Sequence, residues 1–232
     1  VPLTFRKQWF AAVYPCNLTR QALFTYYDFG ELHGSGAEWF MEHCEEFCGL
    51  SIRSSYLREA ELKYLCAAAW SSRTITKIKI HPTVMEKASN WQMLASVFEH
   101  AYFDIIDLAY FLDIPKYSSL IFGALLRCPQ EKNRTKVLDV SGFQSNFTSP
   151  LLMYLDRCPT LTDLSLNSAQ MAPFVFEELL FGLCKRTNLT RLDIGNCEWT
   201  EHACQFFQFL FLQNQQLNDL TISLPPISAE HI

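Results

Sequence analysis

An apolar pattern recurs along this chain at a regular interval of roughly 28 residues, a period typical of a solenoid, whose units bury their apolar faces only against each other. Its clearest copies read Leu-x-x-Leu-x-Leu or Leu-x-x-Leu-x-Ile, and their central leucines, Leu164, Leu192 and Leu220, are evenly spaced. Weaker copies continue the series toward the N-terminus, so the eight central positions are 22, 50, 78, 106, 138, 164, 192 and 220.

Each copy is short enough for one β-strand, and the rest of each unit has room for a helix. Apolar residues at helical spacing predict helices over 37–47, 59–70, 88–100 and 116–128. Three further helices are expected to begin at Ser149-Pro150, at Pro173 and at Thr200. The first strand is expected at Thr19, Ala22 and Phe24. The prediction is therefore an α/β solenoid over 1–232, with a parallel sheet on the concave side and helices on the convex side.

The strand pattern also predicts which side chains are buried. Leu164, Leu192 and Leu220 are expected to be almost fully buried, and in the last helix Ala203, Phe207, Leu210 and Phe211 are expected to face inward. Phe206 and Phe209 lie off that inward stripe, and we expect them to pack sideways on the neighbouring helix.

Composition favours a folded cytoplasmic protein. Hydrophobic residues make up 49% of the chain, and the net charge of −5 gives no support to nucleic-acid binding. No apolar run reaches the roughly 18 residues that a membrane span requires. Nine cysteines fit no disulfide framework and favour a reducing compartment, whereas four glycosylation-type sequences, at Asn17, Asn133, Asn146 and Asn188, favour an exported protein. Because neither end has a clear polar cap, we expect this chain to be a piece of a larger protein.

No sequence motif supports catalysis or cofactor binding. The sequence His43-Cys44-x-x-x-Cys48 offers three soft ligands, but a zinc site needs four and no second pair accompanies it. Phosphate-binding loops, the dinucleotide-binding glycine pattern and the hydrolase Gly-x-Ser-x-Gly turn are absent from the sequence. The prediction is a non-enzymatic protein without metal or cofactor.

The repeat resembles the leucine-rich repeats of the ribonuclease-inhibitor type. The resemblance is carried best by the segment that runs from Leu189 to Trp199 and by Lys136-Val-Leu138-Asp139-Val140-Ser141-Gly142. The phrase Leu-Asp-Val-Ser-Gly-Phe is similar to the repeat region of CARMIL proteins, which link actin capping protein, the Arp2/3 complex and myosin I. That resemblance implies an interaction scaffold with cytoskeletal protein partners.

Charged residues between the inward apolar positions are the candidate partner-binding site on the concave face. The first half of the array is basic there and the second half is acidic; the residues are Arg53, Lys77, Lys79, His81, Asp107, Asp139, Asp163, Asp193 and Asp219. One interpretation is a polarised surface that steers a partner of matching charge. The other is that aspartate after the central leucine is simply frequent in this repeat type and solvated.

Two other functions stay open at this level. The chain could be the substrate-recognition subunit of a ubiquitin ligase, which an adaptor-binding helix pair in flanking sequence would favour. It could also be the recognition or autoinhibitory part of a larger enzyme, which a nucleotide-binding or cysteine-centred domain in the full-length protein would favour.

Overall fold

The fold comes from a computed structural model, which describes residues 27–29, 42–52, 59–80, 88–110, 115–130, 133–143, 148–186 and 188–223. In this part of the chain, strands and helices alternate. The strands are β1 (Tyr27–Phe29), β2 (Gly49–Ile52), β3 (Lys77–Ile80), β4 (Ile105–Asp107), β5 (Val137–Asp139), β6 (Asp163–Ser165), β7 (Arg191–Ile194) and β8 (Asp219–Ile222). The helices are the 3-10 turn η1 (Cys44–Glu46) and α3 (Glu59–Ser71), α4 (Ala88–His100), α5 (Pro115–Arg127), α6 (Thr148–Asp156), α7 (Pro173–Cys184) and α8 (Glu201–Gln213).

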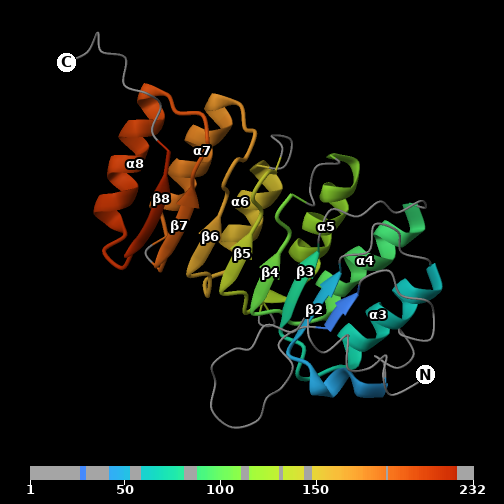
Figure 1. Ribbon diagram of the computed structural model, residues 1–232. Helices are drawn as coiled ribbons and strands as arrows, with labels where there is room; N and C mark the ends of the chain where they lie inside the picture. Colours follow the sequence, from blue (N-terminus) through green and yellow to red (C-terminus); the bar gives the residue numbers. More distant parts are fainter. Residues whose placement is uncertain are drawn as a thin grey trace.

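The strands form one parallel sheet in chain order, from β1 to β8. Helices α3 to α8 lie side by side on one face of that sheet (Figure 1). This α/β architecture is compatible with a solenoid, as the period predicted. We call the sheet face opposite the helices the open face; it corresponds to the predicted concave face.

The register confirms the central positions from residue 50 onward. Leu50 pairs with Ile78, and the following pairs keep each central residue opposite the next, through to Leu192 opposite Leu220. The two irregular spacings, into β5 and into β6, leave this register intact. The extra residues before β5 lie in the loop after α5, where added length costs little, and the step into β6 is short because α6 has 9 residues whereas α5 has 13.

The first strand lies later in the chain than predicted. Tyr27 lies opposite Leu50, so the strand beside β2 is centred on residues 27–29. Thr19, Ala22 and Phe24 lie outside the described residues. A constant step between copies placed the first one too early, because the unit between β1 and β2 is shorter than the others.

Helix boundaries follow local signals. α4 has the predicted bounds, α3 ends one residue later than predicted, α5 begins and ends one residue earlier than predicted, and α7 begins at Pro173 as expected. Thr200 caps α8, since its side chain accepts a hydrogen bond from the Ala203 N–H at 3.0 Å. The prediction placed Pro150 at the first position of α6. The helix begins at Thr148, so Pro150 is its third residue. Of the predicted 37–47 helix, residues 42–46 are helical and 37–41 lie outside the described residues.

The core lies between the sheet and the helices. Leu164 and Leu192 are buried there as predicted. Leu220 is only partly buried, which corrects the prediction, because no described strand or helix lies beyond β8 and α8. Phe206 packs against Phe181 of α7, with ring centroids 5.6 Å apart, which confirms its sideways packing.

Two other phenylalanines of α8 contradict their predictions. Phe209 was expected to pack on the neighbouring helix and Phe211 to face inward, yet both are exposed. The apolar pattern marks a face of α8 but cannot show whether another element covers it.

Turns after the strands share one unusual backbone conformation. Tyr110, Gly142, Ser168 and Asn196 each come four residues after the central position of their unit, and each has a positive φ between 55° and 72°. Glycine and asparagine tolerate this left-handed region, whereas tyrosine rarely adopts it. The turns therefore repeat with the strands and place the residues at the rim of the open face.

Candidate protein-binding surface

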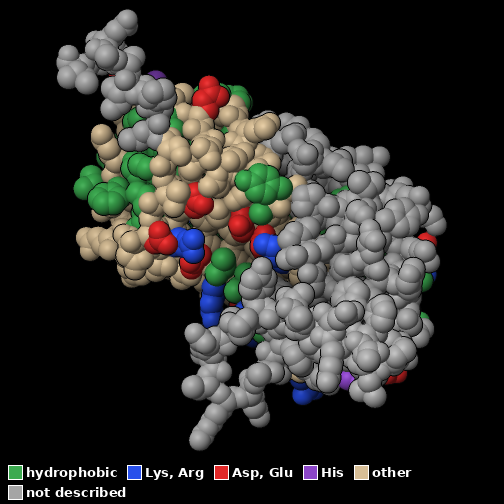
Figure 2. Space-filling view, viewed as in Figure 1, with side chains coloured by type: hydrophobic (Ala, Val, Ile, Leu, Met, Phe, Trp, Pro, Cys, Tyr) green, Lys and Arg blue, Asp and Glu red, His purple; other side chains and the backbone are tan. Residues whose placement is uncertain are grey.

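Seven of the nine predicted partner-binding residues lie on described strands, whereas Arg53 and His81 lie outside the described residues. Strand register arranges the seven in two adjacent columns. One column, directly after the central apolar residues, contains Lys79, Asp107, Asp139 and Asp193; the other, directly before them, contains Lys77, Asp163 and Asp219. Residues of both columns are at least partly exposed while the central residues between them are buried in β3 to β7, so these side chains face away from the helices. Figure 2 shows acidic and basic side chains gathered on the sheet face.

The basic and acidic halves meet at an ion pair. The Lys79 ammonium group contacts the Asp107 carboxylate across the β3–β4 pair. A second pair joins Arg191 to Asp219 at 3.3 Å, with both side chains more than half exposed. Exposed pairs contribute little to stability, because water screens them. No described residue forms an ion pair with Asp139, Asp163 or Asp193, although Arg191 lies opposite Asp163 in the register of β6 and β7. Carboxylates without an ion pair among the described residues therefore lie over β5, β6 and β7.

Three aspartates of this surface also hold the turns that follow their strands. The Asp139 carboxylate accepts hydrogen bonds from the Ser141 N–H at 2.9 Å and the Ser141 hydroxyl at 2.6 Å. Asp107 and Asp193 accept in the same way from the N–H groups of Ala109 and Gly195, at 3.2 and 3.0 Å. Such a bond to the amide two residues on is a common turn device of aspartate. The aspartates are thus more than solvated surface charges, a structural role that the sequence analysis did not assign.

A ladder of polar side chains connects the acidic residues across three strands. The hydroxyl groups of Ser141 and Ser165 lie 2.9 Å apart, and Ser165 donates to Asp193 at 3.3 Å. The Asn167 amide also donates to Asp193, at 3.3 Å. Sequence reasoning did not select Ser141, Ser165 or Asn167, although Ser165 lies between Asp139 and Asp193 in their column and the other two follow Asp139 and Ser165 by two residues. We call the set Asp139, Ser141, Ser165, Asn167 and Asp193 the polar ladder.

The environment of Asp139 differs from that of a solvated carboxylate. Burial raises the pKa of Asp139 above its usual value, and the negative charge of Asp107 acts in the same direction. The hydrogen bonds from Ser141 and the positive charge of Lys79 partly oppose this shift. Asp163 is less engaged, since it accepts a hydrogen bond only from its chain neighbour, the Thr162 hydroxyl, among the described side chains, at 2.5 Å.

The rim of the open face adds an aromatic side chain and a shallow groove. Tyr110 is 53% exposed in the turn after β4. Between the turns after β6 and β7 lies an open groove of about 400 Å³, whose polar lining includes Gln170, Asn196 and Glu198. The Asn196 amide donates to the side-chain oxygen of Asn167 at 3.1 Å, which connects this groove to the polar ladder.

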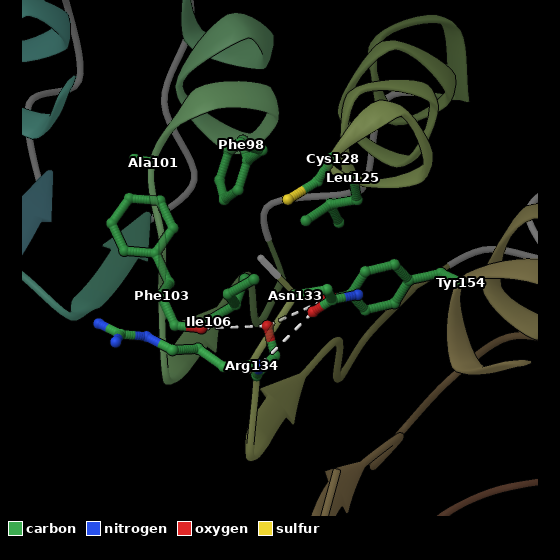
Figure 3. A pocket seen from close by; sticks show the side chains of 10 residues that line it. Phe98, Ala101, Phe103, Ile106, Leu125, Cys128, Asn133, Arg134 and Tyr154 are labelled. Atoms are coloured by element: carbon green, nitrogen blue, oxygen red, sulfur yellow. Dashed lines mark hydrogen bonds between the residues drawn. The ribbon is translucent and has the colours of Figure 1, made fainter. Parts of the chain in front are cut away.

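A cavity between α4, α5 and α6 is too small for a substrate. Its volume is about 10 Å³, enough for about one water molecule. Figure 3 shows Tyr154 of α6 reaching toward Asn133, while Arg134 points away. The Tyr154 hydroxyl donates to Thr135 at 2.9 Å and to Asn133 at 3.3 Å. Asn133, a predicted alternative glycosylation site, is therefore buried and hydrogen-bonded.

Other features of the described residues bear on chemistry and location. Within those residues, no three His, Cys, Asp or Glu side chains are grouped so that they could hold a metal ion. None of the helices in the described part of the chain has the length and apolarity to cross a membrane. The eight described cysteines are free thiols, and burial raises the pKa of Cys66 to about 12 and that of Cys197 to about 11.

Comparison with known proteins adds no assignment. No protein-family model matches the chain, and no curated protein matches it at a significant level.

Proposed function

We propose that this chain is a non-enzymatic interaction scaffold that binds a protein partner on its open face. The proposal is carried by one observation: Asp139, Asp163 and Asp193, none of which forms an ion pair with a described residue, lie on three neighbouring strands of a sheet face that no described helix covers. Solenoids use such continuous surfaces for binding. Their acidic character favours a partner that presents lysine or arginine side chains.

Leucine-rich repeats of the ribonuclease-inhibitor type are the proposed repeat class. The support is that the Leu-x-x-Leu-x-Leu pattern and the strands share one phase, with the central residues buried in register. The residue Cys197 adds support, because it occupies the turn position where this repeat type has asparagine or cysteine. Its thiol lies 3.5 Å from the Leu166 carbonyl oxygen of the preceding unit, where it can satisfy that buried acceptor.

An actin-regulatory partner is the more specific part of the proposal. Its support is the resemblance of Leu138-Asp-Val-Ser-Gly-Phe143 to CARMIL repeats. That segment forms β5 and its turn, and it contributes Asp139 and Ser141 to the polar ladder. Tyr110 beside it is an exposed aromatic residue of the kind that contributes strongly to protein interfaces.

The test removes charge without removing the turn contacts. The variant Asp139→Asn/Asp163→Asn/Asp193→Asn removes three negative charges from the open face. It keeps the turns, because asparagine has a side-chain oxygen that can accept the hydrogen bond from the turn N–H. The matched control removes three exposed charges from the helices, with Asp156→Asn, Glu178→Gln and Glu201→Gln. Both proteins and the wild type are used for affinity capture from a cell lysate at two salt concentrations.

We expect the open-face variant to lose actin-associated proteins that the wild type and the control retain, with weaker capture by the wild type at high salt. Partners that bind all three proteins equally would contradict the open-face part of the proposal. Salt-sensitive capture of ubiquitin-ligase components in place of cytoskeletal proteins would contradict the actin-regulatory part alone.

A further inference from the structure

One of the four glycosylation-type sequences lies inside the folded array. Asn133-Arg134-Thr135 has the Asn-x-Thr pattern of a glycosylation acceptor, in which the asparagine side-chain nitrogen is the modified atom. An attached glycan is bulky and hydrophilic, so an acceptor that carries one lies at the surface. Asn133 and Thr135 are instead only 9% and 3% exposed. This acceptor sequence is part of the core, and its contacts determine what modification does to the fold.

The Asn133 side chain is hydrogen-bonded through both of its polar atoms. Its nitrogen Nδ2 donates to the Arg157 carbonyl oxygen at 3.5 Å. Its oxygen Oδ1 accepts from the Tyr154 hydroxyl at 3.3 Å and from the Thr135 N–H at 3.5 Å. The Cys158 thiol lies 3.5 Å from the same oxygen. Asn133 therefore joins the loop before β5 to helix α6 and to the turn that follows this helix.

Thr135 extends these contacts to the units on both sides. Its hydroxyl donates to the Phe103 carbonyl oxygen at 3.1 Å, in the unit before, and accepts from the Tyr154 hydroxyl at 2.9 Å. Its carbonyl oxygen lies 3.2 Å from the Cys158 thiol, in the unit after. Buried polar groups need hydrogen-bond partners, and these side chains find theirs in one another. We call Asn133, Thr135, Tyr154 and Cys158 the buried network.

No space for a sugar exists beside Asn133. The adjoining cavity has a volume of about 10 Å³, enough for about one water molecule, and a sugar is many times larger. Figure 3 shows the Asn133 amide directed toward Tyr154 across this cavity. A glycan on Nδ2 would push Tyr154 and α6 away from β5, and the buried network would lose its hydrogen bonds.

Modification at this position is possible only before the chain folds. In glycosylation, Nδ2 forms a bond to C1 of the sugar and loses one proton, while the bond from C1 to the lipid-linked diphosphate that carried the sugar breaks. The enzyme that catalyses this transfer has to reach Nδ2, which the folded chain encloses. A glycan attached earlier stays on the chain and prevents α6 from packing on β5.

We propose that glycosylation of Asn133 and folding of this chain exclude each other, so that the chain folds in a compartment where this acceptor is not modified. Asn133 and Thr135 then serve to join adjacent units and not to carry a glycan. The proposal does not rest on the proposed function, because the buried network lies between the sheet and the helices and not on the open face.

Synthesis of the full chain in two compartments of a eukaryotic cell tests the proposal. One form carries an added signal sequence that directs it into the secretory pathway, and the other is made in the cytosol. Mass spectrometry of peptides measures the occupancy of Asn133, and limited proteolysis measures folding. We expect the secretory form to carry a glycan at Asn133 and to be digested at least about tenfold faster than the cytosolic form, because cleavage follows the unfolded population.

Two variants separate the glycan from other effects of the secretory pathway. Arg134→Pro abolishes the acceptor pattern and keeps both Asn133 and Thr135. The Arg134 side chain is 52% exposed and pairs with Asp104 at 3.2 Å, so its loss leaves the buried network in place. Asn133→Asp removes the acceptor nitrogen and keeps the oxygen. Each variant should be digested in its secretory form as slowly as in its cytosolic form.

The matched control is Asn188→Gln, which removes a second acceptor sequence at an exposed asparagine and should leave the secretory form as sensitive as wild type. A secretory wild-type chain that carries a glycan at Asn133 and still resists digestion overturns the proposal. A secretory chain that folds with Asn133 unmodified overturns it too, because the compartment then sets no condition on folding. Rapid digestion of both variants in the secretory form alone would show that another feature of that pathway prevents folding, which is equally fatal to the proposal.

Discussion

Replacing Gly142 with alanine should destabilise the chain through two separate effects. Gly142 has a φ of 72°, a conformation that side chains with a β-carbon rarely adopt. An added β-carbon would also lie 2.3 Å from Cδ1 and 2.7 Å from Cε1 of the Tyr110 ring, far inside contact distance. The ring would have to rotate away from the turn that follows β5.

The size of each effect can be worked out separately. The left-handed backbone costs about 1–2 kcal/mol for a residue with a β-carbon. Displacing the ring costs about 1 kcal/mol, at the low end for overpacking, because Tyr110 is half exposed and can move into solvent. Gly142→Ala should therefore lower the free energy of unfolding by about 2–3 kcal/mol. In a Tyr110→Ala background only the backbone effect remains, about 1–2 kcal/mol.

Urea unfolding of the wild type, both single variants and the double variant measures this coupling. The control is Gly123→Ala in α5, where the added β-carbon approaches only the end of the Arg127 side chain, at 3.3 Å. That change should stabilise the helix by up to about 1 kcal/mol, which is the opposite sign. Equal costs of Gly142→Ala with and without the Tyr110 ring would refute the contact, and a cost near zero would refute the backbone argument as well.

Four further substitutions test the core and the polar ladder by urea unfolding. Leu192→Ala should lower the free energy of unfolding by about 2–5 kcal/mol, and Leu220→Ala by about half as much, because Leu220 is only partly buried. Tyr154→Phe should cost about 1–3 kcal/mol, because it leaves buried Thr135 and Asn133 without their hydroxyl partner. Burial raises the pKa of Asp139 above its ordinary value of 3.8, so the folded chain holds this proton more tightly than the unfolded chain. Stability should therefore fall as the pH rises from the pKa of the unfolded chain through the higher pKa of the folded chain. Asp139→Asn removes this loss, and its stability relative to wild type should therefore rise from about pH 4 to about pH 7; a constant difference would contradict the assigned environment.

Periodicity predicted most of the strands because each central apolar residue packs against its equivalents in adjacent units. From Leu50 onward the positions and the register agree, even where the step is longer than the period, into β5, or shorter, into β6. The first strand could not be placed in this way, since Tyr27 lies opposite Leu50 and the step between them is shorter than the period. Which segment pairs with β2 depends on contacts between strands, and a weak local pattern does not determine them.

The exposure of Phe209 and Phe211 in α8 could not be predicted from the sequence, for a related reason. The apolar residues of α8 fit an inward stripe and a neighbouring helix equally well, and Phe206 does pack on α7. Whether Phe211 is buried depends on a unit beyond α8, which the spacing within α8 does not specify. The burial of Leu183 shows what the same position does when the neighbour is present.

The candidate site shows why charge alone was an incomplete guide to function. Columns of acidic residues could be read from the alternation of the strands, and the register confirms that arrangement. Hydrogen bonding then separates the acids: Asp107, Asp139 and Asp193 each hold the turn after their own strand, whereas Asp163 holds none of these turns. At the first three positions an aspartate is also explained by its role in folding, because it holds the turn. Asp163 has no such explanation, and the loss of partner affinity on its neutralisation is therefore the most direct measure of a binding role for the open face.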